Sequence, residues 1–202
     1  ETVGKQVIGT KAPKDKDFPI LIKFIDAKES LSVQVHPDDK YALLHEGESG
    51  KTEMWYVMDA TPDATLIYGF THEISHQEFE RRIKDNTLLE VCNQVPIKKG
   101  DVFFFFFCTL NAIGAGALIA EIQQSSNSTY RVYDYGRVGK DGKLRELHIE
   151  KALAVTKLEP PTKKPEPIAK LTAFADYDLT ILAQCKLFNV SHFDLHGNCS
   201  LN

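Results

Sequence analysis

The residues best suited to chemistry begin in a short segment, 31–36, in which polar and apolar side chains alternate. Ser32, Gln34 and His36 fall on one face of this segment, and leucine and valine occupy the other, which is the period of a half-buried strand. Pro37 has no backbone N–H and ends the strand, so His36 lies at its last position. The polar face therefore offers a hydroxyl, a carboxamide and an imidazole in a row, and the last two can bind metals.

A second alternating segment follows shortly afterwards, with Lys51, Glu53 and Trp55 on one face. If the two strands lie side by side in one barrel, the Glu53 carboxylate meets the amide and the imidazole of the first segment, next to the Lys51 ammonium. Such a group of donors is suited to a divalent metal with a cation beside it. The alternative is that each segment is an amphipathic surface strand whose polar face lies in water.

The elements that must position these side chains are mostly short strands. Apolar and alternating runs predict a buried strand at 18–24, a strand pair at 53–58 and 64–70 around a turn at 61–63, and further strands at 102–107, 117–123 and 129–133. Helices are predicted at 38–45, at 76–85 behind the N-cap Ser75 with its capping-box partner Glu78, and at 87–93 and 148–155. Many short strands with a helical insertion are typical of an antiparallel barrel or jelly roll of the kind that cupins use.

The predicted organisation is mainly β, with one large domain and the beginning of another. Residues 1–156 are expected to form a cupin-type jelly-roll barrel with a small helical insertion at about 73–95. Residues 157–168 are rich in proline and charge and read as a linker. Residues 169–202 contain two more strand candidates within 179–194, which begin a second, incomplete β domain.

Composition and charge are those of an ordinary globular protein. The 202 residues suffice for one large or two small domains with a core. The net charge of −4 gives no general reason to bind nucleic acid or an anionic membrane, so an anionic substrate must meet local cations. The 4 cysteines form no CxxC pair or disulfide spacing, and no targeting segment is visible. These features predict a cytoplasmic protein; its oligomeric state is left open.

Several stretches of the sequence resemble one known family. The resemblance to type I mannose-6-phosphate isomerase, a family of cupin enzymes, runs from about residue 18 to residue 150 and more weakly to the end. It rests on LSVQVHPDD at 31–39, GKTEMWY at 50–56, AEIQQS at 120–125 and YRVYDYGR at 130–137. It implies a first cupin barrel and the start of a second. Compared with the family, the beginning of the first domain and most of the second are missing.

The resemblance implies a zinc site, one per chain, with Gln34, His36 and Glu53 as ligands. In the family the fourth ligand is a histidine in a Leu-His-Ala-Ile-Gly turn, where this chain has Asn111. A carboxamide oxygen can bind a divalent metal but is a poorer zinc ligand than imidazole, so weak zinc binding is expected. A Pro-x-Gly step of the family is replaced by Phe-Phe-Cys, ending at Cys108. Cys108 is interpreted either as a substitute thiolate or as a small buried residue.

The cation expected to serve a phosphorylated sugar is Arg131. Alternation along its strand places it opposite Tyr130 and Val132, so it lies either inside the barrel, where it needs an anionic partner, or on the surface. Arg131 matches the active-site arginine of the resembling family. Lys51 and Ser32 match polar groups that line the family's pocket.

The reaction that the resemblance implies is the interconversion of mannose 6-phosphate and fructose 6-phosphate through a cis-enediol. The metal would hold and polarise the sugar oxygens at C1 and C2, and Arg131 would stabilise the developing enediolate. Lys51 and Ser32 would orient the substrate or assist proton movement, and the base is left open. One alternative, favoured by Asn111 and the shortened chain, is a degenerate cupin that binds a sugar or a protein partner without catalysis. Another is a metal cupin acting on a different sugar phosphate.

Overall fold

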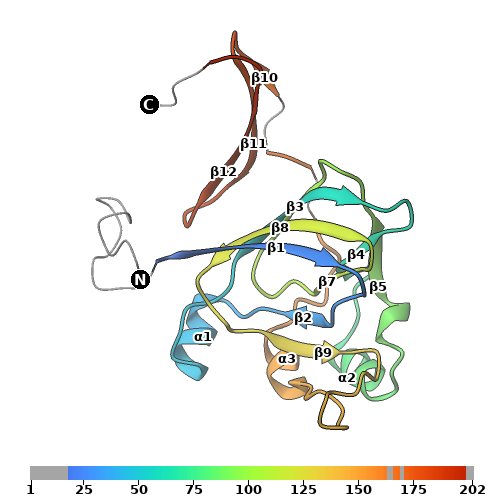
Figure 1. Cartoon of the computed structure of the whole chain (residues 1–202). Coiled ribbons are helices and arrows are strands. Elements are labelled where there is room, and N and C mark those ends of the chain that lie inside the picture. The colour runs from blue at the N-terminus through green and yellow to red at the C-terminus, as the bar shows by residue number, and fades with distance from the viewer. Residues whose placement is uncertain (1–17, 163–165, 169–170, 199–202) are drawn as a thin grey trace.

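The computed structural model describes residues 18–162, 166–168 and 171–198. Two antiparallel sheets face each other and form a barrel (Figure 1). In spatial order one sheet contains β1 (Ile20–Ala27), β8 (Ala117–Gln124), β3 (Glu53–Ala60) and β6 (Val102–Phe105); the other contains β5 (Cys92–Pro96), β4 (Thr65–Phe70), β7 (Asn111–Ile113), β2 (Val33–Val35) and β9 (Tyr130–Tyr133). The mainly β, cupin-type fold is thus confirmed. Linker residues 163–165, Cys199 and the segment before residue 18 lie outside the described residues.

The space between the two sheets is filled by an apolar core. Trp55 of β3 and the two inward phenylalanines of β6, Phe103 and Phe105, pack with Leu66 and Tyr68 of β4. The ring centroids of Trp55 and Phe105 are 4.3 Å apart. Because side chains of a strand alternate between its faces, every second residue of these strands enters the barrel. The core fixes the distance between the sheets, and with it the geometry of any site between them.

Three α-helices lie outside the barrel in the described part of the chain. α2 (His76–Lys84) and α3 (Ile149–Val155) cover the outer face of the five-stranded sheet, and α1 (Asp39–His45) follows β2 (Figure 1). The predicted cap of α2 is confirmed, because Ser75 Oγ accepts a hydrogen bond from the Glu78 backbone N–H at 3.1 Å. Among the described residues, no helix has the length and apolar character needed to cross a membrane.

A small third sheet packs on the outer face of the four-stranded sheet. It consists of β10 (Thr172–Ala173), β11 (Tyr177–Gln184) and β12 (Asn189–Leu195). Leu182 and Phe188 pack there against Met54 and Phe104. The two strand candidates of the C-terminal segment are therefore confirmed, and they lie against the barrel.

Two predictions about strand placement are wrong. The predicted pair at 53–58 and 64–70 does not form, because β3 and β4 enter opposite sheets. The turn between them carries the chain across the barrel, with the Thr61 N–H donating to Gly116 O at 2.9 Å. The strand predicted as buried at 18–24 is β1, an edge strand, and Phe24 on its outer face is 72% exposed. Apolar content predicts a strand but does not decide whether a neighbour covers it.

Local structure also differs in three short segments. The predicted helix at 87–93 is a single 3-10 turn, Leu88–Glu90, followed by β5. The helical insertion is therefore shorter than expected, because long-range pairing of β5 with β4 overrides the weak local preference. The turn expected at 110–114 contains β7, which pairs with β2 and β4. The strand expected at 102–107 ends at Phe105.

Candidate functional site

The polar residues of the two alternating segments meet inside the barrel. The side-by-side arrangement expected for them is wrong, because β2 and β3 belong to different sheets. Their inward faces converge nevertheless, since closing a barrel brings the inner faces of its sheets together. Both sheets contribute side chains to one cavity of about 40 Å³, among them Ser32, Gln34, His36, Lys51, Glu53, Asn111 and Glu121.

A close backbone contact at Gly50 joins the end of β2 to the start of β3. The Lys51 backbone N–H donates to Pro37 O at 3.3 Å, and the Gly50 N–H donates to Asp39 Oδ1 at 2.9 Å. A Cβ on Gly50 would lie 2.5 Å from the backbone carbon of Asp38. Only glycine therefore allows the two chain segments to approach this closely.

His36 is held by one ring nitrogen and presents the other to the cavity. Its Nδ1 lies 3.2 Å from the backbone oxygen of Ser128. A carbonyl oxygen only accepts, so in the neutral ring Nδ1 carries the proton and Nε2 presents its lone pair to the cavity, where Lys51 Nζ can donate to it. Nε2 lies 3.4 Å from Glu53 Oε1 and 3.3 Å from Lys51 Nζ. This is the tautomer in which a histidine binds a metal through Nε2.

A buried charge cluster surrounds Lys51. Its Nζ forms an ion pair with Glu53 and lies 3.4 Å from Glu121 Oε1. Burial by itself raises the pKa of Glu53, because it disfavours the charged carboxylate. The nearby Lys51 charge and His36 have the larger, opposite effect, and the pKa of Glu53 is lowered to about 2. Burial also works against the Lys51 ammonium, but Glu53 and Glu121 raise the pKa of Lys51. At neutral pH the cluster therefore contains the Glu53 carboxylate and the Lys51 ammonium.

The two carboxamides of the site face each other across neighbouring strands. Gln34 of β2 pairs with Asn111 of β7. Gln34 Nε2 donates to Ser32 Oγ at 2.8 Å, and Asn111 Nδ2 donates to Thr109 O at 3.1 Å. Because both amide nitrogens are bound to the protein, Gln34 Oε1 and Asn111 Oδ1 are the groups left to accept or coordinate a ligand.

This set of residues fits a divalent cation. Glu53 Oε1 is buried and has no hydrogen-bond partner among the described residues. A buried polar atom without a partner destabilises the fold unless a ligand binds to it. Two atoms that each lie about 2.1 Å from one metal are roughly 3–3.5 Å apart, and His36 Nε2 and Glu53 Oε1 are 3.4 Å apart. No group of three His, Cys, Asp or Glu side chains in the described ranges could hold a metal. A metal here therefore also needs the oxygens of Gln34 and Asn111.

Arg131 borders the cavity through Ser32. Its Nε donates to Ser32 Oγ at 3.3 Å, and its Nη1 donates to Glu146 O at 3.0 Å. Partial burial and then the neighbouring charge of Arg145 lower the pKa of Arg131, so an anion at this edge would be favourable. Ser32 Oγ accepts from both Arg131 and Gln34. The hydroxyl thereby connects the cation to the amide of the site.

Glu121 and Lys23 belong to the charge cluster although the sequence pattern did not identify them. Glu121 of β8 lines the cavity and is 4% exposed, and Lys23 Nζ of β1 donates to its Oε1 at 2.8 Å. A signal was present, because alternation along β8 places Glu121 on the same face as the fully buried Ile119. A charged residue on an otherwise apolar strand face indicates a buried partner or a ligand.

Cys108 is outside the cavity. Its side chain belongs to the apolar cluster between the five-stranded sheet and the helices that cover it, and burial raises the pKa of its thiol. The small buried residue is thus the interpretation that fits, because a metal-binding cysteine must be a thiolate. Its φ of +70° is unusual for a residue with a side chain. The Cys108 N–H donates to His36 O at 2.7 Å, so the backbone of this turn helps to hold His36 in place.

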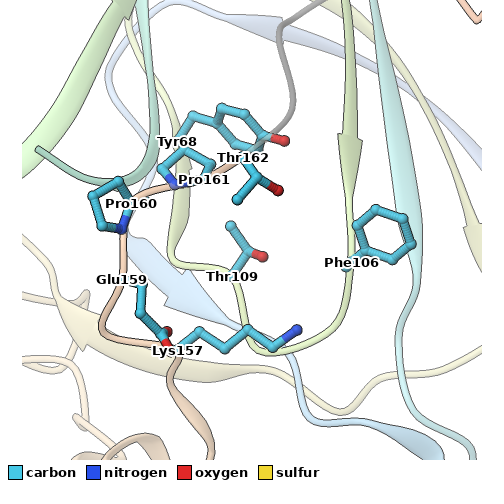
Figure 2. Close-up of a pocket in the computed structure, with 9 residues that line it drawn as sticks. Tyr68, Phe106, Thr109, Lys157, Glu159, Pro160, Pro161 and Thr162 are labelled. Carbon is cyan, nitrogen blue, oxygen red and sulfur yellow. The ribbon is translucent and has the colours of Figure 1, made fainter. Parts of the chain in front are cut away.

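A larger cavity of about 370 Å³ lies where the linker passes over the barrel (Figure 2). Its walls include Tyr68, Phe106 and Thr109 from the barrel and Lys157, Glu159 and Pro161 from the linker. The Lys157 N–H donates to Cys108 O at 2.8 Å. A Cβ on Gly69 would lie 2.8 Å from Pro161 Cδ. The first residues of the predicted linker are therefore packed on the barrel.

Comparisons with known proteins agree with this picture. Residues 1–53 match the family model described as phosphomannose isomerase type I, catalytic domain. The mannose-6-phosphate isomerase ManA of Bacillus subtilis is 42% identical over 185 residues, which cover 91% of this chain and 58% of ManA. The mannose-6-phosphate isomerase of Streptococcus mutans is 40% identical over 189 residues, covering 93% of this chain and 58% of that protein.

A solved structure is similar as well. The crystal structure of mannose 6-phosphate isomerase from Bacillus subtilis superposes with a TM-score of 0.86 at 36% identity, covering 96% of this chain and 60% of that one. The chain thus spans about three fifths of the length of these relatives.

Proposed function

We infer that the chain belongs to the type I phosphomannose isomerase family, and we propose that its pocket interconverts mannose 6-phosphate and fructose 6-phosphate through a cis-enediol. The observation that carries the proposal is the convergence of His36, Glu53, two amide oxygens and the Lys51 ammonium on one buried cavity. The similarity to mannose-6-phosphate isomerases over nearly the whole chain supports it.

Gln34, His36, Glu53 and Asn111 are the residues that would hold a zinc ion. Glu53 Oε1 has no hydrogen-bond partner among the described residues, the amide oxygens of Gln34 and Asn111 are left over after their nitrogens donate, and His36 Nε2 faces the cavity beside Lys51 Nζ. When bound, the metal supplies positive charge that polarises the sugar oxygens at C1 and C2.

Lys51, Ser32 and Arg131 would then act on the substrate directly. Lys51 is an ammonium between Glu53 and Glu121, so it can donate to a sugar oxygen that becomes negative in the enediolate. Ser32 would orient the substrate through its hydroxyl. Arg131 would stabilise the negative charge at the edge of the cavity, where its partly buried guanidinium has no carboxylate partner among the described residues.

The domain boundaries and the location in the cell are part of this proposal. A first cupin barrel at 1–156, a linker at 157–168 and the beginning of a second, incomplete β domain at 169–202 are part of the proposal, and the third sheet supports them. A cytoplasmic location is supported by the cysteines: within the described residues Cys92, Cys108 and Cys185 are all free, which suits a reducing compartment.

The test is a coupled assay that measures fructose 6-phosphate formed from mannose 6-phosphate. We expect Arg131→Ala to lose turnover by about 100-fold or more, the usual effect of removing a group that stabilises developing charge, and to keep nearly the wild-type melting temperature. Arg81→Ala is the matched control, because the Arg81 side chain is 59% exposed on α2. If Arg131→Ala unfolds while activity per folded molecule is unchanged, Arg131 is a structural residue.

A second candidate function is a cupin that binds a sugar phosphate without catalysis. Asn111 in the position of a histidine ligand favours it, because a neutral amide oxygen is a poorer zinc ligand than an imidazole. Calorimetry with mannose 6-phosphate distinguishes the two functions. Binding without turnover, in protein supplied with metal, supports the non-catalytic cupin.

A further inference from the structure

The metal-binding atoms of the cavity are mostly oxygens. Among the described residues that line the cavity, His36 Nε2, beside Lys51 Nζ, is the single nitrogen with a lone pair for a metal, and the other donors are Glu53 Oε1, Gln34 Oε1 and Asn111 Oδ1. Zinc prefers nitrogen and sulfur ligands in a tetrahedral arrangement, whereas carboxylate and carbonyl oxygens suit harder ions such as Mn²⁺. One imidazole with three oxygens is therefore a donor set closer to the preference of Mn²⁺ than a set with two imidazoles.

Hydrogen bonds hold both amide groups in the orientation that leaves their oxygens available to a metal. Gln34 Nε2 is bound to Ser32 Oγ, and Asn111 Nδ2 is bound to Thr109 O. Turning either amide to present nitrogen to the cavity would break that hydrogen bond and put N–H donors where a cation must lie. Hydrogen bonds of this kind behind the ligands hold them in place and tune the metal.

The cavity is also arranged for a positive charge. The Lys51 ammonium already lies 3.3 Å from His36 Nε2 and pairs with Glu53 Oε2, so it sits beside two of the residues that would coordinate a metal. Glu121 adds a second acidic side chain, with its Oε1 3.4 Å from Lys51 Nζ. A divalent cation can thus enter by moving one flexible lysine side chain, with Glu121 remaining as its partner.

We propose that this site binds an oxygen-preferring divalent cation, Mn²⁺, and that Asn111 sets the preference by replacing a nitrogen donor with an amide oxygen. The proposal rests on the metal site of the proposed function; it replaces zinc with Mn²⁺ as the bound ion and names the residue that selects it. Water molecules would complete the octahedral coordination that Mn²⁺ favours and tetrahedral zinc does not.

The test compares Mn²⁺ and Zn²⁺ binding to the full chain after removal of metal with a chelator. Isothermal titration gives the affinity and stoichiometry for each ion, and electron paramagnetic resonance reports bound Mn²⁺ directly. For the wild-type chain we expect one Mn²⁺ per chain, lost in Glu53→Gln. For Asn111→His we expect zinc affinity to rise at least tenfold while Mn²⁺ affinity changes by less than threefold. Asn189→His is the matched control, because Asn189 is exposed on β12 of the third sheet.

The outcomes separate this inference from the proposed function. Failure of the wild-type chain to bind Mn²⁺ overturns the inference, and this measurement needs no variant that must fold. Equal gains for both ions in Asn111→His, or none, overturn the selecting role of Asn111. If Mn²⁺ binds with the expected dependence on Glu53 and Asn111 but mannose 6-phosphate is not converted, the proposed function fails and the metal inference stands.

Discussion

Gly50→Ala should damage both the stability and the metal site, because Gly50 is the point where the segments after β2 and before β3 touch. An added Cβ would lie 2.5 Å from Asp38 C, 2.6 Å from Asp39 N and 2.8 Å from Pro37 O. All three are backbone atoms, so no side-chain rotation can relieve the contact. Ordinary contacts are about 3.5 Å or longer, so the two segments must separate by about 1 Å.

The expected cost follows from this overlap. Forcing an extra methyl group into a packed site costs about 1–3 kcal/mol. A loss of about 2 kcal/mol corresponds to a fall in melting temperature of about 4–8 °C for a chain of this size. The same separation moves His36 away from Glu53; His36 Nε2 and Glu53 Oε1 are now 3.4 Å apart. We therefore expect metal affinity to fall at least tenfold.

The assay combines urea unfolding with metal titration, and Gly47→Ala is its control. Gly47 has a φ of +71° and no atom within 4 Å of an added Cβ, so its substitution brings only backbone strain of about 1 kcal/mol and no effect on metal binding. If Gly50→Ala is no less stable than Gly47→Ala, the backbone contact at Gly50 is not a constraint on the fold. If Gly50→Ala is less stable but binds metal as the wild type does, the contact does not position His36 and Glu53.

Two further predictions concern acid stability and the linker. The pKa of Glu53 is lowered from 4.5 to about 2, so its contribution to stability is present above the unfolded value and is lost as the pH falls toward the folded value. Urea unfolding between pH 7 and pH 3 should show a steeper loss in the wild type than in Glu53→Gln, and parallel curves would contradict this. Gly69 has a left-handed backbone with a φ of +68°, and a Cβ added there would lie 2.8 Å from Pro161 Cδ. Gly69→Ala should therefore lower the free energy of unfolding by about 1–2 kcal/mol from the backbone strain. It should also speed proteolysis of the linker, and an unchanged cleavage rate would show that Pro161 does not fasten the linker there.

The sequence by itself determined which side chains share a face. Alternation placed Ser32, Gln34 and His36 on one face of the first segment and Lys51 with Glu53 on one face of the second, and the structure has all of them around one cavity. Local chemistry also gave the cap of α2, because a capping hydrogen bond joins residues three apart in the chain. Such features depend on neighbours in sequence, so no knowledge of the fold is needed to find them.

The tertiary structure alone decided which faces meet. A period of two residues fixes the face of a strand but not its partner, so the expected pairing of neighbouring strands failed while the convergence of their inward faces held. Glu121 joined the site because β8 lies between β1 and β3. The orientation of the Asn111 amide depends on Thr109 O, and the approach of β2 to β3 depends on backbone contacts at Gly50. These contacts are set by how the barrel closes, which no short stretch of sequence encodes.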